Sequence, residues 1–247
     1  MIQNKILTVL VLTILVVCNL RAMEEVEIPL PDASSLYAVV HPAVASKPII
    51  LMFHQSGSNV HGEYASIWRR LQAEGYGYVA VDLRAGGQLY GDYNRSVARR
   101  PSQVSLCDAY EGAEASLLYV KTRWPESSIV AWGSSFSAAH VIRLASEFPD
   151  DLEKVVAFSP SSGGPMKHCK ADAYLEGLSV PLLLVRPESE LEIPSVQTQF
   201  QLAVDLKHET FVARPGHHGA STLDGSRVQG PVDESWQKLF DFLDKDL

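Results

Sequence analysis

The stretch that decides the fold is residues 129–139, which read IVAWGSSFSAA. An apolar run leads through small residues directly into a segment of helical composition. Such a strand-to-helix turn holds one residue in a strained conformation, with its side chain exposed and the helix N-terminus beneath it. Ser135 occupies this corner, and we predict that it is a nucleophile. The alternative is an ordinary strand-to-helix turn in which a serine caps the helix.

Apolar runs typical of buried strands flank this segment on both sides. Strands that are apolar throughout are buried on both faces, and helices between them imply parallel pairing with right-handed crossovers. We therefore predict an α/β fold with a doubly wound, mostly parallel eight-stranded sheet, helices on both faces and an antiparallel start. The predicted strands are 26–30, 36–41, 48–54, 78–83, 128–132, 155–158, 181–185 and 210–213, and the predicted helices are 63–73, 108–124, 136–148, 195–205 and 233–242.

The chain has 247 residues, of which 46% are hydrophobic, and this suits one domain with a large core, at 23–247. The longest stretches without periodicity are about 85–105 and 160–178. Both follow the carboxyl ends of predicted strands, where open α/β sheets bind ligands. The segment between the strands at 155–158 and 181–185 is too short for a large lid, so we expect an open site.

Residues 1–22 have the layout of a secretory signal peptide, with Lys5 and Arg21 on either side of an apolar run and no acidic residue. A retained N-terminal anchor is an alternative, although the run is short for a membrane-spanning helix. A lipoprotein signal, in which Cys18 is acylated, is a second alternative. In each case we expect export, to the periplasm or the medium.

Charge and cysteine content limit the partners further. The formal charge is −8, and it becomes −10 without residues 1–22, which hold two cations and no anion. Nucleic acids and polyanionic substrates are therefore disfavoured. Because Cys18 lies in the leader, Cys107 and Cys169 remain as a candidate disulfide in an oxidising compartment, with two unrelated buried thiols as the alternative.

The corner at Ser135 resembles the nucleophile motif G-x-S-x-G of the α/β-hydrolase superfamily, with Gly133 in the first position and Ser137 in place of the last glycine. The tight turn needs small side chains, and serine adds only a hydroxymethyl group. Residues 82–87 and 94–96 look like the loop after the fourth strand in the dienelactone-hydrolase-like branch. The founding enzymes of that branch use a cysteine nucleophile, whereas this chain has Ser135.

A serine hydroxyl needs a base to take its proton and an acid to orient that base. The resemblance implies the chain order Ser, acid, His. For the base, His218 followed by Gly219 resembles the superfamily's His-Gly loop, with His217 as the alternative.

For the acid, residues 181–194 resemble the segment in which a strand ends in a turn that bears the acid shortly before a Val/Ile-Pro pair. Glu190 falls on the acid's position, and Glu188 and Glu192 are near enough to compete. A solvated acidic loop is the other interpretation.

The tetrahedral intermediate of acyl transfer needs N–H donors aimed at its oxyanion. The resemblance implies the backbone N–H of Phe136 as one donor. The segment 53–58, which resembles the family's His-Gly-x-Gly loop, implies Ser56 as the other, with Gln55 as the runner-up. We expect His54 to brace this loop.

These features predict a serine hydrolase that cleaves a carboxylic ester of a small acyl substrate through a Ser-His-Glu triad and an acyl-enzyme. A serine peptidase or amidase on the same triad, and a binding module of the same fold without turnover, are the alternatives. Haloalkane and epoxide chemistry normally need an Asp nucleophile in this fold. No pair of histidines has metal-ligand spacing with a third partner, so we expect neither a metal nor another cofactor.

Overall fold

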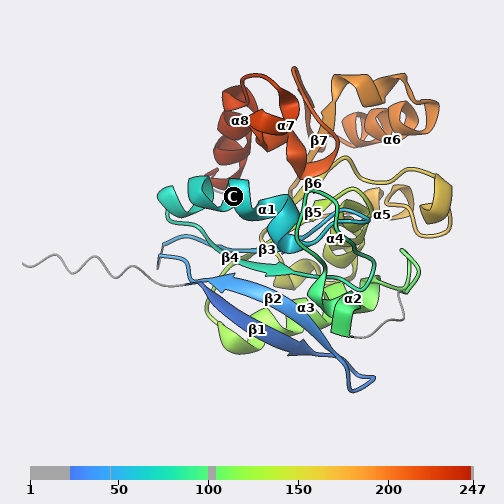
Figure 1. Cartoon of the computed structure of the whole chain (residues 1–247). Coiled ribbons are helices and arrows are strands. Elements are labelled where there is room, and N and C mark those ends of the chain that lie inside the picture. The colour runs from blue at the N-terminus through green and yellow to red at the C-terminus, as the bar shows by residue number, and fades with distance from the viewer. Residues whose placement is uncertain (1–22, 45, 100–103, 246–247) are drawn as a thin grey trace, which may run out of the picture.

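The computed structural model describes residues 23–44, 46–99 and 104–245 (Figure 1). Within them, eight strands form one sheet in the spatial order β1-β2-β4-β3-β5-β6-β7-β8. Along the chain the strands are β1 (Glu24–Pro29), β2 (Ser35–His41), β3 (Ile49–Phe53), β4 (Gly77–Val81), β5 (Ile129–Ser134), β6 (Lys154–Phe158), β7 (Leu182–Pro187) and β8 (Glu209–Ala213). β2 runs antiparallel to both of its neighbours, and all pairs from β4 to β8 are parallel. The predicted sheet is thus confirmed.

The five predicted helices are present as well. They are α1 (Val60–Ala73), α3 (Tyr110–Arg123), α4 (Phe136–Glu147), α6 (Pro194–Asp205) and α8 (Asp233–Leu243). α1 begins earlier than predicted, because the Asn59 side chain accepts the N–H of Gly62 at 2.8 Å and caps the first turn. In the described ranges, three further α-helices, too short to give a helical period, lie in loops: α2 (Arg95–Arg99), α5 (Asp172–Leu175) and α7 (Gly225–Val228).

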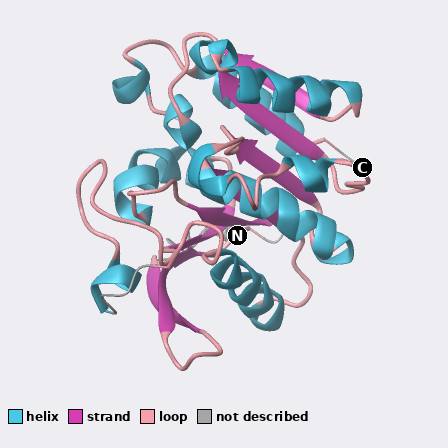
Figure 2. Ribbon diagram, turned by 90° about the vertical axis from the view of Figure 1, so that its right-hand side faces the viewer, coloured by secondary structure: helices cyan, strands magenta, loops and turns pink. Residues whose placement is uncertain are grey.

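Helices cover both faces of the sheet (Figure 2). α1 and α8 pack on one face, against side chains such as Ile50 and Trp132. α3, α4 and α6 pack on the other, against side chains such as Leu51 and Ala131. Neighbouring residues of β3 and β5 thus enter opposite cores, which explains why these strands are apolar throughout.

The order of the strands brings distant loops to one edge of the sheet. From β3 the chain crosses to β4 on one side, and it later returns to β5 on the other side of β3. In register, Phe53 pairs with Gly133, and Ser134 pairs with Phe158. The loops after β3, β5, β7 and β8 therefore leave the sheet at its carboxyl edge, where open α/β sheets bind ligands.

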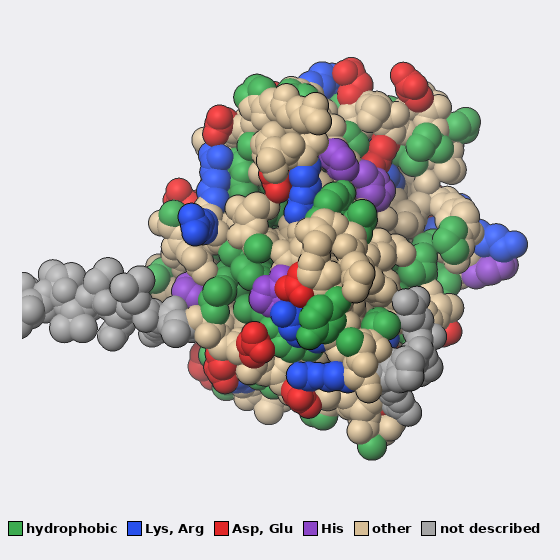
Figure 3. Space-filling model, viewed as in Figure 1, with side chains coloured by type: hydrophobic (Ala, Val, Ile, Leu, Met, Phe, Trp, Pro, Cys, Tyr) green, Lys and Arg blue, Asp and Glu red, His purple; other side chains and the backbone are tan. Residues whose placement is uncertain are grey.

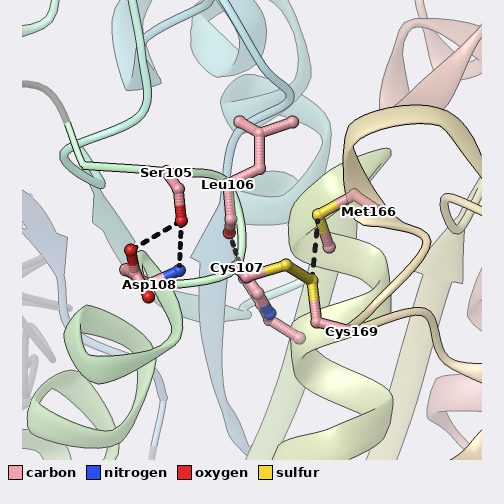
Figure 4. Close-up of a disulfide and its surroundings, with 7 residues drawn as sticks. Ser105, Leu106, Cys107, Asp108, Met166 and Cys169 are labelled. Carbon is pink, nitrogen blue, oxygen red and sulfur yellow. Dashed lines mark hydrogen bonds between the residues drawn. A yellow bond between two sulfur atoms is a disulfide. The ribbon is translucent and has the colours of Figure 1, made fainter.

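A disulfide joins Cys107, just before α3, to Cys169 in the segment between β6 and β7 (Figure 4). The Cα atoms are 5.8 Å apart. The predicted pairing is therefore confirmed. The predicted leader and Cys18 lie outside the described residues, and in the described ranges no helix is long and apolar enough to cross a bilayer.

The disulfide closes a loop with a sequence separation of 62 residues, so its removal should destabilise the fold by about 2–4 kcal/mol. We expect Cys107→Ser and Cys169→Ser to lower the free energy of unfolding in urea equally, and the double variant to cost no more than either single one. Wild-type protein in a reducing agent should fall to the same value. Two free thiols in protein made under oxidising conditions would contradict the bond.

Candidate active site

Ser135 lies between β5 and α4 in a strained backbone conformation. Its φ is 61° and its ψ is −114°, a region that side chains other than glycine seldom adopt. The N–H of Ser135 donates to Phe158 O at 2.8 Å, and its C=O accepts from Ala138 N at 3.1 Å. Ser135 is partly exposed, whereas Ser134 and Phe136 on either side are buried. The corner thus presents the Ser135 side chain to solvent, as the sequence predicted.

His218 and Glu190 meet at the same edge of the sheet. Nδ1 of His218 lies 2.5 Å from Oε1 of Glu190. The His218 side chain, on the loop after β8, is 45% exposed, whereas that of Glu190, in the 3-10 helix η3 (Glu188–Glu192) after β7, is only 11% exposed. A carboxylate at Nδ1 selects the tautomer that carries its proton there, so Nε2 is left as the acceptor.

The competing candidates lie elsewhere. Glu188 forms an exposed ion pair with Arg214 at 2.7 Å, and Glu192 is exposed. His217 has its ring 6.4 Å from that of Tyr90, in an edge-on arrangement. Of the three carboxylates considered, Glu190 alone reaches a histidine.

The loop that carries His218 packs directly on the Ser135 corner. The N–H of Ala220 donates to Ser134 Oγ at 2.9 Å, and the N–H of Gly219 donates to Ser159 Oγ at 3.0 Å. Gly219 has φ +67°, and a Cβ there would lie 2.3 Å from Ser134 Oγ. In the described part of the chain no hydrogen bond joins Ser135 to His218, and such contacts often form only when substrate binds.

The two N–H groups expected to hold an oxyanion are available. Phe136 is the first residue of α4, so its N–H has no acceptor within the helix. Among the hydrogen bonds of the described residues, neither this N–H nor that of Ser56 has a partner. The N–H of Gln55, the runner-up, donates instead to Glu63 Oε2 at 2.6 Å.

His54 holds the loop after β3 in place. It is fully buried, its Nδ1 lies 2.8 Å from Gln55 O, and its Nε2 accepts from Leu83 N at 2.9 Å. Burial lowers the pKa of His54. A neutral ring with the proton on Nδ1 satisfies both contacts, in agreement with the expected bracing role.

Arg186 is a part of the site that the sequence reasoning missed. Its buried guanidinium donates through Nη1 to Glu190 Oε2 at 2.7 Å and through Nη2 to Gln199 Oε1 at 2.5 Å. Ser159 Oγ donates to the other oxygen of Glu190 at 2.9 Å. Burial raises the pKa of Glu190, but the hydrogen bond to His218 and the charge of Arg186 outweigh it and hold the pKa below its usual range. A cation at the end of an otherwise apolar strand was the available signal.

Comparison with solved structures identifies the fold of the chain. The Pyrococcus furiosus esterase Pf2001 matches with a TM-score of 0.68 at 20% identity, over 90% of this chain and 91% of that one. A dienelactone hydrolase from Anabaena variabilis matches with a TM-score of 0.65 at 16% identity, over 90% of this chain and 96% of that one. The chain has the α/β-hydrolase fold. No protein-family model matches the sequence, and no curated protein matches it.

A third structural neighbour is larger. The acylaminoacyl peptidase of Pyrococcus horikoshii matches with a TM-score of 0.65 at 16% identity, over 92% of this chain but only 41% of that one. In the described ranges of this chain, no three His, Cys, Asp or Glu side chains converge so that they could hold a metal ion.

This α/β-hydrolase fold tolerates Ser137 in place of the usual last glycine of the motif because the serine takes part in the turn. Its Oγ donates to Phe53 O at 2.8 Å and accepts from Ser134 N at 2.9 Å. At Gly133, by contrast, a Cβ would lie 2.4 Å from Ser137 O. The first position of the motif therefore admits only glycine, while the last uses a hydroxyl to tie β3 to the corner.

Glu190→Gln tests the acid. A neutral amide can neither select the tautomer of His218 nor balance the imidazolium charge, so kcat on an ester should fall by about 10⁴-fold. Thermal melts should show that the fold is kept. Glu188→Gln and Glu192→Gln are the matched controls, and a larger loss of kcat in either than in Glu190→Gln would mean that the acid is misassigned.

Arg186→Met tests the buried cation. At neutral pH we expect the free energy of unfolding to fall by about 3–5 kcal/mol, because Glu190 loses its counter-ion. The pKa of Glu190 in the folded protein lies below its ordinary value of 4.5. Its ionised form therefore stabilises the wild type fully above pH 4.5, and this stabilisation is lost as the pH falls through the lowered pKa. The difference in the free energy of unfolding between wild type and variant should therefore become smaller below pH 4.5, the ordinary pKa of a glutamate.

Urea titrations at pH values above and below 4.5 measure this difference in the free energy of unfolding. Arg214→Met is the control, because its ion pair with Glu188 is exposed and should contribute little at any pH. If the free energy that Arg186→Met loses does not depend on pH, Arg186 acts through packing alone.

Proposed function

We propose that this chain is an exported serine hydrolase that cleaves carboxylic esters of small acyl substrates. The observation that supports it most directly is the 2.5 Å contact between His218 and Glu190, on a loop that packs against the strained corner at Ser135. A nucleophile, a base and an acid in these positions satisfy the requirements of acyl transfer.

In the proposed reaction, His218 Nε2 accepts the proton of Ser135 Oγ while Oγ attacks the ester carbonyl carbon. The oxyanion that forms is held by the N–H groups of Phe136 and Ser56. The tetrahedral intermediate then expels the alcohol, which takes the proton from His218. A water molecule, activated by the same ring, hydrolyses the acyl-enzyme and frees Ser135.

The loops that carry the candidate site residues are short and bear exposed apolar side chains, which favours a small substrate with an apolar group. The segment between β6 and β7 holds only the short helices η2 (Gly164–Met166) and α5, and no domain-sized lid. Leu89, whose N–H donates to Gly57 O at 2.9 Å, and Ile193, close to Glu190, are 44% and 50% exposed. Histidine and hydrophobic side chains are both exposed on the face seen in Figure 3.

A peptidase or amidase is the second candidate, because the acylaminoacyl peptidase of Pyrococcus horikoshii is among the structural neighbours. The same residues would then have to protonate an amine leaving group, which is a poorer leaving group than an alcohol. We favour esters, because their alcohol leaving group asks less of these residues.

Export to an oxidising compartment is part of the proposal. It rests on the layout of residues 1–22 and on the Cys107–Cys169 disulfide, which is compatible with it. The formal charge of −8 argues against nucleic acid as a partner.

A fluorophosphonate probe and a graded panel of aryl esters with matching amides test the function together. We expect the probe to label Ser135 and the esters to be turned over faster than the amides. Ser135→Ala should lose both labelling and turnover. Ser134→Ala, whose hydroxyl is buried, should lose stability but still be labelled. Faster cleavage of the amides would favour the peptidase, and a wild type that is neither labelled nor active would favour a binding module.

A further inference from the structure

Glu63, in the first turn of α1, is a carboxylic acid that the proposed mechanism does not use. It is fully buried, and a nearby cation, Arg227, donates to its backbone O at 3.1 Å, whereas its side chain accepts the neutral N–H of Gln55. Burial raises the pKa of Glu63, against the opposing effects of the Ser134 hydroxyl and the Gln55 N–H. Burying such a group is unfavourable unless it forms hydrogen bonds. Their partners lie in the loops that form the site.

The first partner is the loop after β3. Glu63 Oε2 accepts the N–H of Gln55 at 2.6 Å. The C=O of Gln55, in turn, accepts from Ser58 N at 3.1 Å and lies 2.8 Å from His54 Nδ1. The peptide units on both sides of Gln55 are thus fixed. Because C=O and N–H point in opposite directions in a planar trans peptide, fixing the C=O of Gln55 also fixes the direction of the Ser56 N–H.

The second partner is the end of β5. Glu63 Oε1 has no hydrogen bond of normal geometry, but the Ser134 hydroxyl lies beside it. Ser134 Oγ accepts the N–H of Ala220 from the loop that carries the candidate base. A Cβ built on Gly219 would lie 2.3 Å from Ser134 Oγ and 3.7 Å from Glu63 Oε1. Glu63 therefore stands where the loops after β3, β5 and β8 converge.

We propose that Glu63 is a positioning residue of the oxyanion site, which holds the Gln55 N–H so that the Ser56 N–H is aimed at the substrate's carbonyl oxygen. This inference rests on the proposed ester hydrolysis. Glu63 does not touch the substrate and acts through the Gln55 backbone. The role needs an acceptor oxygen at this place, and it does not need a negative charge, since the donor is a neutral peptide group.

Two substitutions separate the acceptor from the charge. Glu63→Leu removes the acceptor, and kcat on the preferred ester should fall by about 10- to 100-fold with KM almost unchanged, because oxyanion donors act mainly in the transition state. Glu63→Gln keeps an acceptor oxygen and should remain within about threefold of wild-type kcat. The affinity for a boronic acid, a mimic of the tetrahedral intermediate, should fall in parallel with kcat/KM.

Asp82→Asn is the matched control for a purely structural effect. Asp82 is also a fully buried carboxylate that accepts backbone N–H groups, from Val60 at 2.8 Å and Arg95 at 2.7 Å, but it does not contact Gln55. The Asp82→Asn substitution should lower the melting temperature and leave the affinity for the boronic acid unchanged. An equal loss of that affinity in Asp82→Asn and Glu63→Leu would overturn the positioning role.

The other outcomes are equally decisive. Wild-type kcat in Glu63→Leu, or equal losses in the Gln and Leu variants, would overturn the inference. If Glu63→Leu does not fold, Glu63→Asp, which is shorter by one methylene, should lose kcat and boronic acid affinity together, and a loss of kcat alone would overturn it. A wild type that a fluorophosphonate does not label at Ser135 removes the proposed function and this inference with it. If Ser135 is labelled and Glu63→Leu keeps the wild-type kcat, only the inference about Glu63 is overturned.

Discussion

The close approach of the first turn of α4 to the end of β5 is the constraint on which the candidate site depends. It leaves no room for a side chain at Gly133, and it forces Ser135 into the left-handed region. The strain is tolerated because the Ser135 peptide and the Ser137 hydroxyl are bonded to Phe158 and Phe53, the last residues of the adjacent strands. The sheet thus holds the corner from both sides.

Buried charge is arranged around this corner in two different ways. Glu190 accepts from a cation, Arg186, through one oxygen and from the His218 ring and the Ser159 hydroxyl through the other, so its burial is balanced by one positive charge and by hydrogen bonds. The Glu63 side chain accepts from a neutral donor, the Gln55 N–H, while Arg227 donates to the backbone O of Glu63, and burial dominates the ionisation of the side chain. The first arrangement suits a carboxylate that must stay ionised, and the second suits an acceptor that has no need of charge.

Apolar periodicity was enough to predict the sheet, the five longer helices and the corner at Ser135, because burial on two faces dictates those patterns. The short helices α2, α5 and α7 have too few residues to show a period. Arg186 and Glu63 were missed for a different reason. Arg186 contacts Gln199 on α6, and Glu63 lies beside Ser134 at the end of β5. These partners are far apart in the sequence or belong to other elements, so only the fold brings them together. Glu63 shares a helix face with Ile67 and Leu71, so an acid on that face was the clue.

The disulfide also divides the candidate site topologically. The covalent ring from Cys107 to Cys169 encloses β5, Ser135, α4 and β6, whereas His218 and Glu190 lie outside it, toward the C-terminus. Local opening of β7 and β8 would separate the base and the acid from the nucleophile, while the ring kept the corner at Ser135 closed. Such a local opening would disrupt the candidate triad without global unfolding and without breaking the ring.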